Sequence, residues 1–102
     1  MAKFLKTSIV IPMWNEEKRV ENAYKQLHEY ISKNDLDIQL VFASNGCTDK
    51  TVDIINELKK KDSNLIHYDY SEPIGKGKAI QQAFEMVQTP YVIFMDCDIA
   101  LP

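Results

Sequence analysis

Residues 91–98 read Tyr-Val-Ile-Phe-Met-Asp-Cys-Asp, so an apolar run ends abruptly in two carboxylates. The run at 91–95 predicts a buried strand, because a short, continuous apolar stretch is typical of parallel sheets. Side chains alternate along a strand, so Asp96 and Asp98 project to one side and Cys97 to the other. Two like charges at that spacing favour a divalent metal between them. For these residues taken alone, a solvated acidic loop is the alternative.

The overall composition is that of an ordinary globular domain. The chain has 102 residues, 45% of them hydrophobic and 26% charged, with a formal net charge of -3. These values fit one domain that spans residues 1–102. No basic stripe is present to neutralise phosphates, which argues against a nucleic-acid partner.

Cysteine usage and hydropathy favour a cytoplasmic protein. Cys47 and Cys97 are isolated and lack the spacing of a zinc or redox motif, so a reduced intracellular setting is expected. No stretch approaches the ~20 apolar residues of a membrane span. We therefore predict that this part of the protein is cytoplasmic or faces the cytosol.

Strand-like and helix-like segments alternate along the chain. Apolar runs predict strands at 8–11, 38–43, 65–70 and 91–96. Helical periodicity fills the three intervals, and the first helix is predicted at 16–33 with Asn15 as its N-cap. Polar alternation in the third strand predicts a sheet edge. The order β-α-β-α-β-α-β predicts an α/β fold, a parallel sheet with helices on both faces.

Each unusual loop follows the carboxyl end of a predicted strand. These loops are 12–17, 44–49, 72–78 and 96–102. Ligands of parallel sheets bind beyond the carboxyl ends of the strands, near the point where strand order reverses. Four polar or glycine-bearing loops that meet at one edge therefore predict a binding site there.

The loops at this edge of the sheet do not match two common phosphate-binding motifs. The first loop has no glycine, and the loop at 75–77 has Ile80 where a dinucleotide fingerprint requires its third glycine. A P-loop is excluded as well, because Ala79 follows Gly-Lys where serine or threonine is required.

The four loops together resemble those of glycosyltransferase family 2, whose members have the GT-A nucleotide-sugar fold. That family typically reads I-P-x-[YF]-N-E-E in the first loop, and residues 11–17 read Ile-Pro-Met-Trp-Asn-Glu-Glu. Its D-D-G-S-x-D-x-[ST], N-x-G-K-G-x-A and D-x-D motifs correspond to 44–51, 74–79 and 96–98. The resemblance spans residues 7–102, with the motifs in the family's order and spacing.

This resemblance implies the Rossmann-like half of a GT-A fold. It also implies a metal-dependent reaction that transfers a sugar from a nucleoside-diphosphate sugar with inversion of the anomeric carbon, in cell wall or glycan biosynthesis. Residues 1–102 are expected to be a nucleotide-sugar-binding piece of a longer glycosyltransferase, inactive in transfer alone. An acceptor-side base is not expected in this chain. The Asn-Glu-Glu-Lys-Arg run and the Gly-Lys-Gly loop resemble the branch that glycosylates polyprenyl (dolichyl) phosphate, and a glycan acceptor stays open.

Site residues follow from the same resemblance. It implies that the nucleotide sugar contacts Pro12, Trp14, Glu16, Asn45, Gly75, Lys76 and Asp96. It assigns the binding of Mg²⁺ or Mn²⁺ to Asp98, and it assigns to Asp96 either a contact to the ribose or a water-mediated contact to the metal. Structural roles stay open as alternatives: core packing for Trp14, a first-turn carboxylate for Glu16, a solvated side chain for Lys76 and a turn for Gly75.

One departure from the family pattern is Ser44-Asn45, which replaces an acidic pair. Asn45 can accept a hydrogen bond from the base through its side-chain carbonyl, without the charge. The departure supports one rival reading, a non-catalytic domain that keeps the fold as a scaffold. A nucleotidyltransferase-like enzyme with the same metal chemistry is the other rival.

The strand predicted at 91–96 carries a further expectation. If it has no outer neighbour, it leaves a hydrophobic sheet edge that is liable to self-association.

Overall fold

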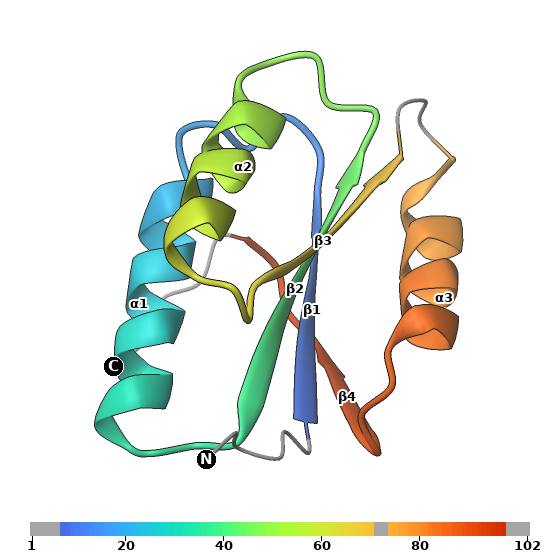
Figure 1. The fold of residues 1–102 in the computed structure, drawn as a ribbon. Helices are drawn as coiled ribbons and strands as arrows, with labels where there is room; N and C mark the ends of the chain where they lie inside the picture. Colours follow the sequence, from blue (N-terminus) through green and yellow to red (C-terminus); the bar gives the residue numbers. More distant parts are fainter. Residues whose placement is uncertain (1–6, 71–73, 98–102) are drawn as a thin grey trace.

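Four strands alternate with three helices in residues 7–70 and 74–97, the part of the chain that the computed structural model describes. In chain order the elements are β1 (Thr7–Met13), α1 (Val20–Lys33), β2 (Ile38–Asn45), α2 (Thr51–Lys61), β3 (Ile66–Tyr70), α3 (Lys76–Met86) and β4 (Tyr91–Phe94) (Figure 1). The predicted order of elements is confirmed. No helix within those ranges combines the length and the apolar composition that crossing a bilayer requires.

The strands are all parallel and lie in the order β3-β2-β1-β4. At the central strand, Thr7 pairs with Ile38 of β2 on one side and with Tyr91 of β4 on the other. The chain runs outward from β1 to β3 and then crosses back to β4, so strand order reverses at β1 (Figure 1). β3 is an edge strand, as its polar pattern predicted.

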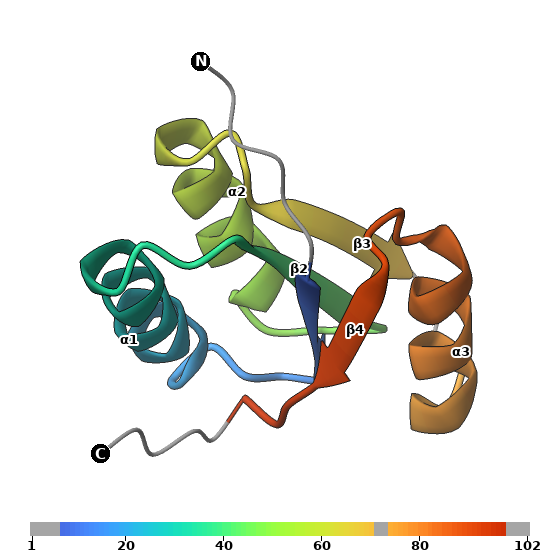
Figure 2. The same ribbon diagram turned by 90° about the horizontal axis from the view of Figure 1, so that it is seen from below.

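Helices cover both faces of the sheet, as predicted. Figures 1 and 2 show α1 and α2 on one face and α3 on the other. The alternation of side chains along β1 accounts for the two layers. Ile9 and Ile11 belong to a core cluster that includes Val20 of α1, whereas Val10 belongs to a second cluster with Ala83 of α3.

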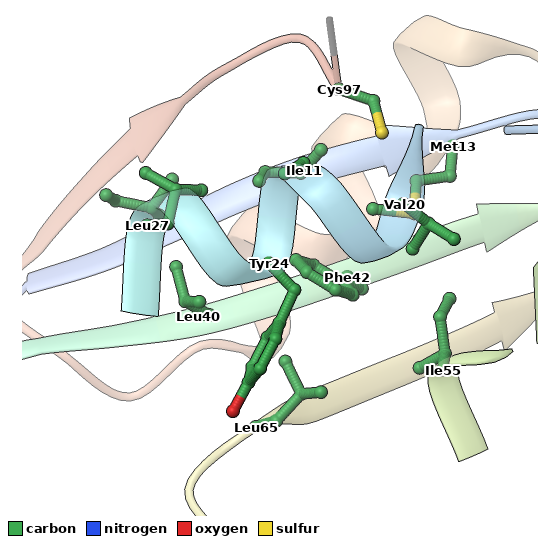
Figure 3. Close-up of a cluster of buried hydrophobic side chains, with 12 residues drawn as sticks. Ile11, Met13, Val20, Tyr24, Leu27, Leu40, Phe42, Ile55, Leu65 and Cys97 are labelled. Atoms are coloured by element: carbon green, nitrogen blue, oxygen red, sulfur yellow. The ribbon is translucent and has the colours of Figure 1, made fainter. Parts of the chain in front are cut away.

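The larger core cluster surrounds Phe42 of β2, which is fully buried (Figure 3). Tyr24 of α1 meets Phe42 edge to face, with ring centroids 6.5 Å apart and planes at 88°. The Tyr24 hydroxyl donates a hydrogen bond to Asp62 Oδ2 at 2.8 Å, so this buried ring keeps a partner for its polar atom. Burial, reinforced by the Asp62 carboxylate, raises the pKa of Tyr24 to about 12.

The first helix begins at Val20 rather than at residue 16, and the predicted N-cap is wrong. Asn15 has a left-handed backbone with φ of +51°, and its side chain accepts from the loop after β2. Glu16 instead opens a turn, in which its carbonyl accepts from the N–H groups of Arg19 at 2.9 Å and Val20 at 2.8 Å. Hydrogen bonds to a distant segment have overridden the local capping preference of asparagine.

Replacing Phe42 with alanine should lower the free energy of unfolding by about 3–5 kcal/mol, because a fully buried aromatic ring leaves a cavity. Urea unfolding followed by circular dichroism measures the change. Phe84→Ala is the matched control: Phe84 is 55% exposed and stacks on Phe94, so its loss should cost about 1 kcal/mol or less. Equal losses in both variants would contradict a core centred on Phe42.

Candidate functional site

A pocket of about 530 Å³ opens at the carboxyl edge of the sheet, where β1 and β4 are neighbours. Its lining consists of Pro12, Met13, Trp14, Glu16, Arg19, Asn45, Asp96 and Cys97. Strand order reverses at β1, and parallel α/β sheets bind ligands in the crevice at such a point. The pocket therefore lies at the edge that the loop pattern predicted.

Most of the predicted site residues meet in this pocket: Pro12, Trp14, Glu16, Asn45 and Asp96. Gly75 is the N-cap of α3 and lies outside the described lining, and Lys76 is the first residue of that helix. Gly75 has φ of +87°, and a Cβ there would meet nothing within 4 Å, so its backbone conformation rather than close packing calls for glycine. Asp98, the predicted metal ligand, lies outside the described residues.

Asp96 is fixed at the pocket by the residues on either side of it. The Met95 N–H donates to the Val10 carbonyl at 3.1 Å, which extends the pairing of β4 with β1 by one residue. Cys97 is only 6% exposed and joins the larger core cluster near Met13 (Figure 3). Asp96 itself is exposed between these two anchors and lines the pocket.

Glu16 and Arg19 form an ion pair in the pocket lining, from Arg19 Nε to Glu16 Oε2. Among the described residues that line the pocket, Arg19 is the basic side chain, and Glu16 and Asp96 are the two acidic ones. Sequence reasoning missed Arg19, because a helix predicted from residue 16 placed it on a helix instead of in the turn beside the pocket. Its position in the Asn-Glu-Glu-Lys-Arg run was the available signal.

Asn45 and Ser44 point to opposite faces of β2, and only Asn45 lines the pocket. Asn45 Oδ1 accepts the Ile74 N–H at 2.8 Å, which ties the loop before α3 to β2. The oxygen predicted to receive a base N–H is therefore already engaged. A base contact would use its second lone pair or the side-chain amide hydrogens.

Ser44 is fully buried and binds two polar side chains of β3. Its hydroxyl donates to Asp69 Oδ1 at 2.8 Å and lies 2.7 Å from His67 Nε2. Because serine has one hydrogen to donate, His67 Nε2 carries the hydrogen of its own contact. Burial lowers the pKa of His67, and the Lys59 ammonium adds to this effect while Asp69 opposes it.

The loop after β1 is held by the loop after β2 and the start of α2. Asn15 Oδ1 accepts the Thr48 N–H at 2.7 Å, and the Glu16 N–H donates to Thr51 Oγ1 at 2.8 Å. Trp14 precedes this bonded segment and is 62% exposed at the pocket. The second loop thus sets the backbone that carries the pocket side chains of the first.

Comparison with known proteins relates the chain to sugar transferases. The family model described as glycosyl transferase family 2 matches residues 8–102. The bactoprenol glucosyl transferase of Shigella phage SfV is 29% identical over 98 residues, which are 96% of this chain and 32% of that protein.

Solved structures share the fold. The mannosyltransferase PcManGT from Pyrobaculum calidifontis, in complex with GDP-Man and Mn²⁺, has a TM-score of 0.83 at 20% identity, over 98% of this chain and 29% of that one. S. aureus TarS in complex with UDP-GlcNAc has a TM-score of 0.77 at 25% identity, over 92% and 27%. The chain thus spans 27% to 32% of the length of these proteins. The predicted Rossmann-like GT-A architecture is confirmed by these likenesses.

The lowered pKa of His67 makes stability depend on pH. Since the folded state favours the neutral ring, the unfolded chain binds a proton more readily, and stability present above pH 6.5 is lost as the pH falls through the lowered value. Urea unfolding should therefore show that the wild-type protein loses more stability than His67→Gln when the pH is lowered from about 7.5 to about 5, which lie above and below the ordinary pKa of histidine.

His28→Gln is the matched control, since the His28 side chain is 52% exposed on α1 and should leave the His67 contribution in place. The same pH dependence in wild type and His67→Gln would contradict the assignment.

Proposed function

Because the chain belongs to glycosyl transferase family 2, we propose that it is the donor-binding part of a metal-dependent inverting glycosyltransferase. Such an enzyme moves a sugar from a nucleoside-diphosphate sugar to an acceptor. The observation that supports this most is the pocket at the β1–β4 edge. There Trp14, Asn45 and Asp96 come together from three separate segments of the chain.

The nucleoside half of the donor fits the side of the pocket formed by β1 and β2. Trp14 offers an exposed aromatic face on which a base or ribose can pack, and Pro12 adds apolar surface beside it. Asn45 lies at the end of β2, where its amide can contact the base edge. Glu16 supplies a carboxylate acceptor for a ribose hydroxyl or a base N–H.

Binding of the diphosphate is opposed by negative charge, because the described lining has two carboxylates, Glu16 and Asp96, and one guanidinium, Arg19. Carboxylate oxygens suit Mg²⁺ and Mn²⁺, and Mg²⁺ is commonly bound by one or two carboxylates together with substrate phosphates and water. Asp96 and Asp98 are the proposed ligands. The bound metal would stabilise the negative charge of the leaving nucleoside diphosphate.

Gly75 and Lys76 are proposed to meet the same diphosphate from the start of α3. The amino end of a helix carries partial positive charge and backbone N–H groups that suit an anion. Asn45 supports this placement, since its bond to the Ile74 N–H holds the entrance of α3 next to the end of β2.

The acceptor we propose is polyprenyl phosphate, with a glycan as the alternative. A phosphate acceptor is already anionic near neutral pH and attacks without a general base, whereas an alcohol needs one. The bactoprenol glucosyl transferase relative favours the lipid acceptor. Attack from the face opposite the leaving group inverts the anomeric carbon. A lipid acceptor would place the full-length protein at the cytoplasmic face of a membrane.

Binding by the described pocket should depend on Asp96. Asp96→Asn should weaken the affinity of UDP or GDP in Mg²⁺ by about tenfold or more, because a charged metal ligand becomes a neutral one. Isothermal titration calorimetry on residues 1–102 measures this, with Asp53→Asn on the exposed side of α2 as control. Unchanged affinity in Asp96→Asn would favour the scaffold reading.

The same titrations separate the enzyme classes. UDP-sugars or GDP-sugars should bind in preference to nucleoside triphosphates, whereas the reverse order would indicate a nucleotidyltransferase-like enzyme. No sugar transfer is expected from residues 1–102 alone, and measured turnover would overturn that expectation.

Self-association through β4 is also part of the proposal. β4 is an edge strand in the described part of the chain, and it exposes Tyr91, Ile93 and Phe94 without a charged residue to deter pairing. Sedimentation velocity should detect dimers that Ile93→Lys removes and Tyr30→Lys, an exposed change on α1, retains. A wild-type chain that stays monomeric at high concentration would exclude this contact.

A further inference from the structure

Asn15, Asp49 and Thr51 belong to the two motifs that flank the pocket, yet none of them lines it. Their hydrogen bonds instead connect the loop after β1 with the start of α2, across more than 30 residues of sequence. We refer to these three residues as the clasp.

One half of the clasp is the Asn15 side chain. Its Oδ1 accepts backbone N–H groups from Thr48 at 2.7 Å and from Asp49 at 3.3 Å. The Asn15 backbone is left-handed, with φ of +51°, a conformation that asparagine tolerates better than most residues. The first loop thereby binds two amides of the second loop.

The other half runs in the opposite direction. Asp49 Oδ2 accepts the Glu17 N–H at 3.1 Å, and Thr51 Oγ1 accepts the Glu16 N–H at 2.8 Å. Asp49 Oδ1 in turn accepts from both the Thr51 N–H, at 2.9 Å, and the Thr51 hydroxyl. Thr51 is fully buried, so its hydroxyl is held in one place. The second loop thereby binds two amides of the first.

We propose that the clasp positions Trp14 and Glu16 for the nucleotide, an inference that rests on the proposed donor-binding function. Trp14 is 62% exposed, so side-chain packing does little to fix it, and its place depends on the path of the backbone. Glu16 depends on the same path, since its own N–H is bound by Thr51. Asn15, Asp49 and Thr51 are thus positioning residues that act through the first loop.

Helix capping explains only part of these contacts. Asp49 Oδ1 does accept the N–H of Thr51, the first residue of α2, at 2.9 Å. Two of the amides bound by the clasp, those of Glu16 and Glu17, precede a different helix, α1. Burial raises the pKa of Asp49, but the hydrogen bonds from Thr51 and Glu17 outweigh this and the net pKa is lowered, so the carboxylate is kept charged for these contacts.

Two substitutions of Thr51 separate positioning from packing. Thr51→Val keeps the shape but removes the hydroxyl, whereas Thr51→Ser keeps the hydroxyl and removes a methyl group. Thr51→Val should weaken UDP or GDP affinity in Mg²⁺ by about tenfold, because the Glu16 amide loses its acceptor and the loop loosens. Thr51→Ser should stay within about twofold of wild type. Asp49→Ala should resemble Thr51→Val, and Asp53→Ala on the exposed side of α2 should resemble wild type.

Hydrogen exchange of the Glu16 and Glu17 amides gives a second readout that needs no ligand. Exchange at Glu16 should accelerate about tenfold in Thr51→Val and stay slow in Thr51→Ser. Faster exchange with unchanged nucleotide affinity would overturn the positioning role. If the wild-type protein binds neither UDP nor GDP, the proposed donor-binding function is wrong. Exchange at Glu16 tests the clasp independently, because equal exchange rates in all variants would refute it.

Discussion

The pairing of β1 with β2 on one side and β4 on the other is the constraint on which the site depends. Because the chain reaches β4 only after crossing back from β3, the loops that follow β1 and β4 leave the sheet side by side. The crevice between them is the pocket. A shift of β1 by one residue would exchange the faces of Ile11 and Val10 between two cores, so burial on both faces keeps this register fixed.

Different interactions hold three loops at this end of the sheet, two of which line the pocket. Burial anchors the loop after β4, since Cys97 is inserted in the core and leaves Asp96 at the pocket. Hydrogen bonds anchor the loop after β1, through Asn15 and its partners near α2. A polar contact, from the Ile74 N–H to Asn45 Oδ1, holds the described part of the loop before α3. Apolar contacts thus fix the frame, and polar contacts set the side chains that face a ligand.

The fold was predictable because strands that are buried on both faces have continuous apolar runs. Residues 9–11 and 41–43 are such runs, and all six are buried. Local rules failed where distant contacts compete with them. Asn15 looks like a cap in sequence, but it accepts amides from the second loop, so the helix starts later and Arg19 enters the pocket. The hydrogen bond from the Ile74 N–H to Asn45 Oδ1 could not be predicted from the sequence either, because no spacing rule links residues so far apart.

The central claim is that the β1–β4 pocket binds the nucleotide of a sugar donor. Its most direct test is an NMR titration of residues 1–102 with UDP and with GDP in the presence of Mg²⁺, following backbone amides and the indole N–H of Trp14, the one tryptophan in the chain. We expect the shift changes to concentrate at Trp14, Asn45 and Asp96. No saturable change with either nucleotide, or changes confined to surfaces away from these residues, would contradict the claim.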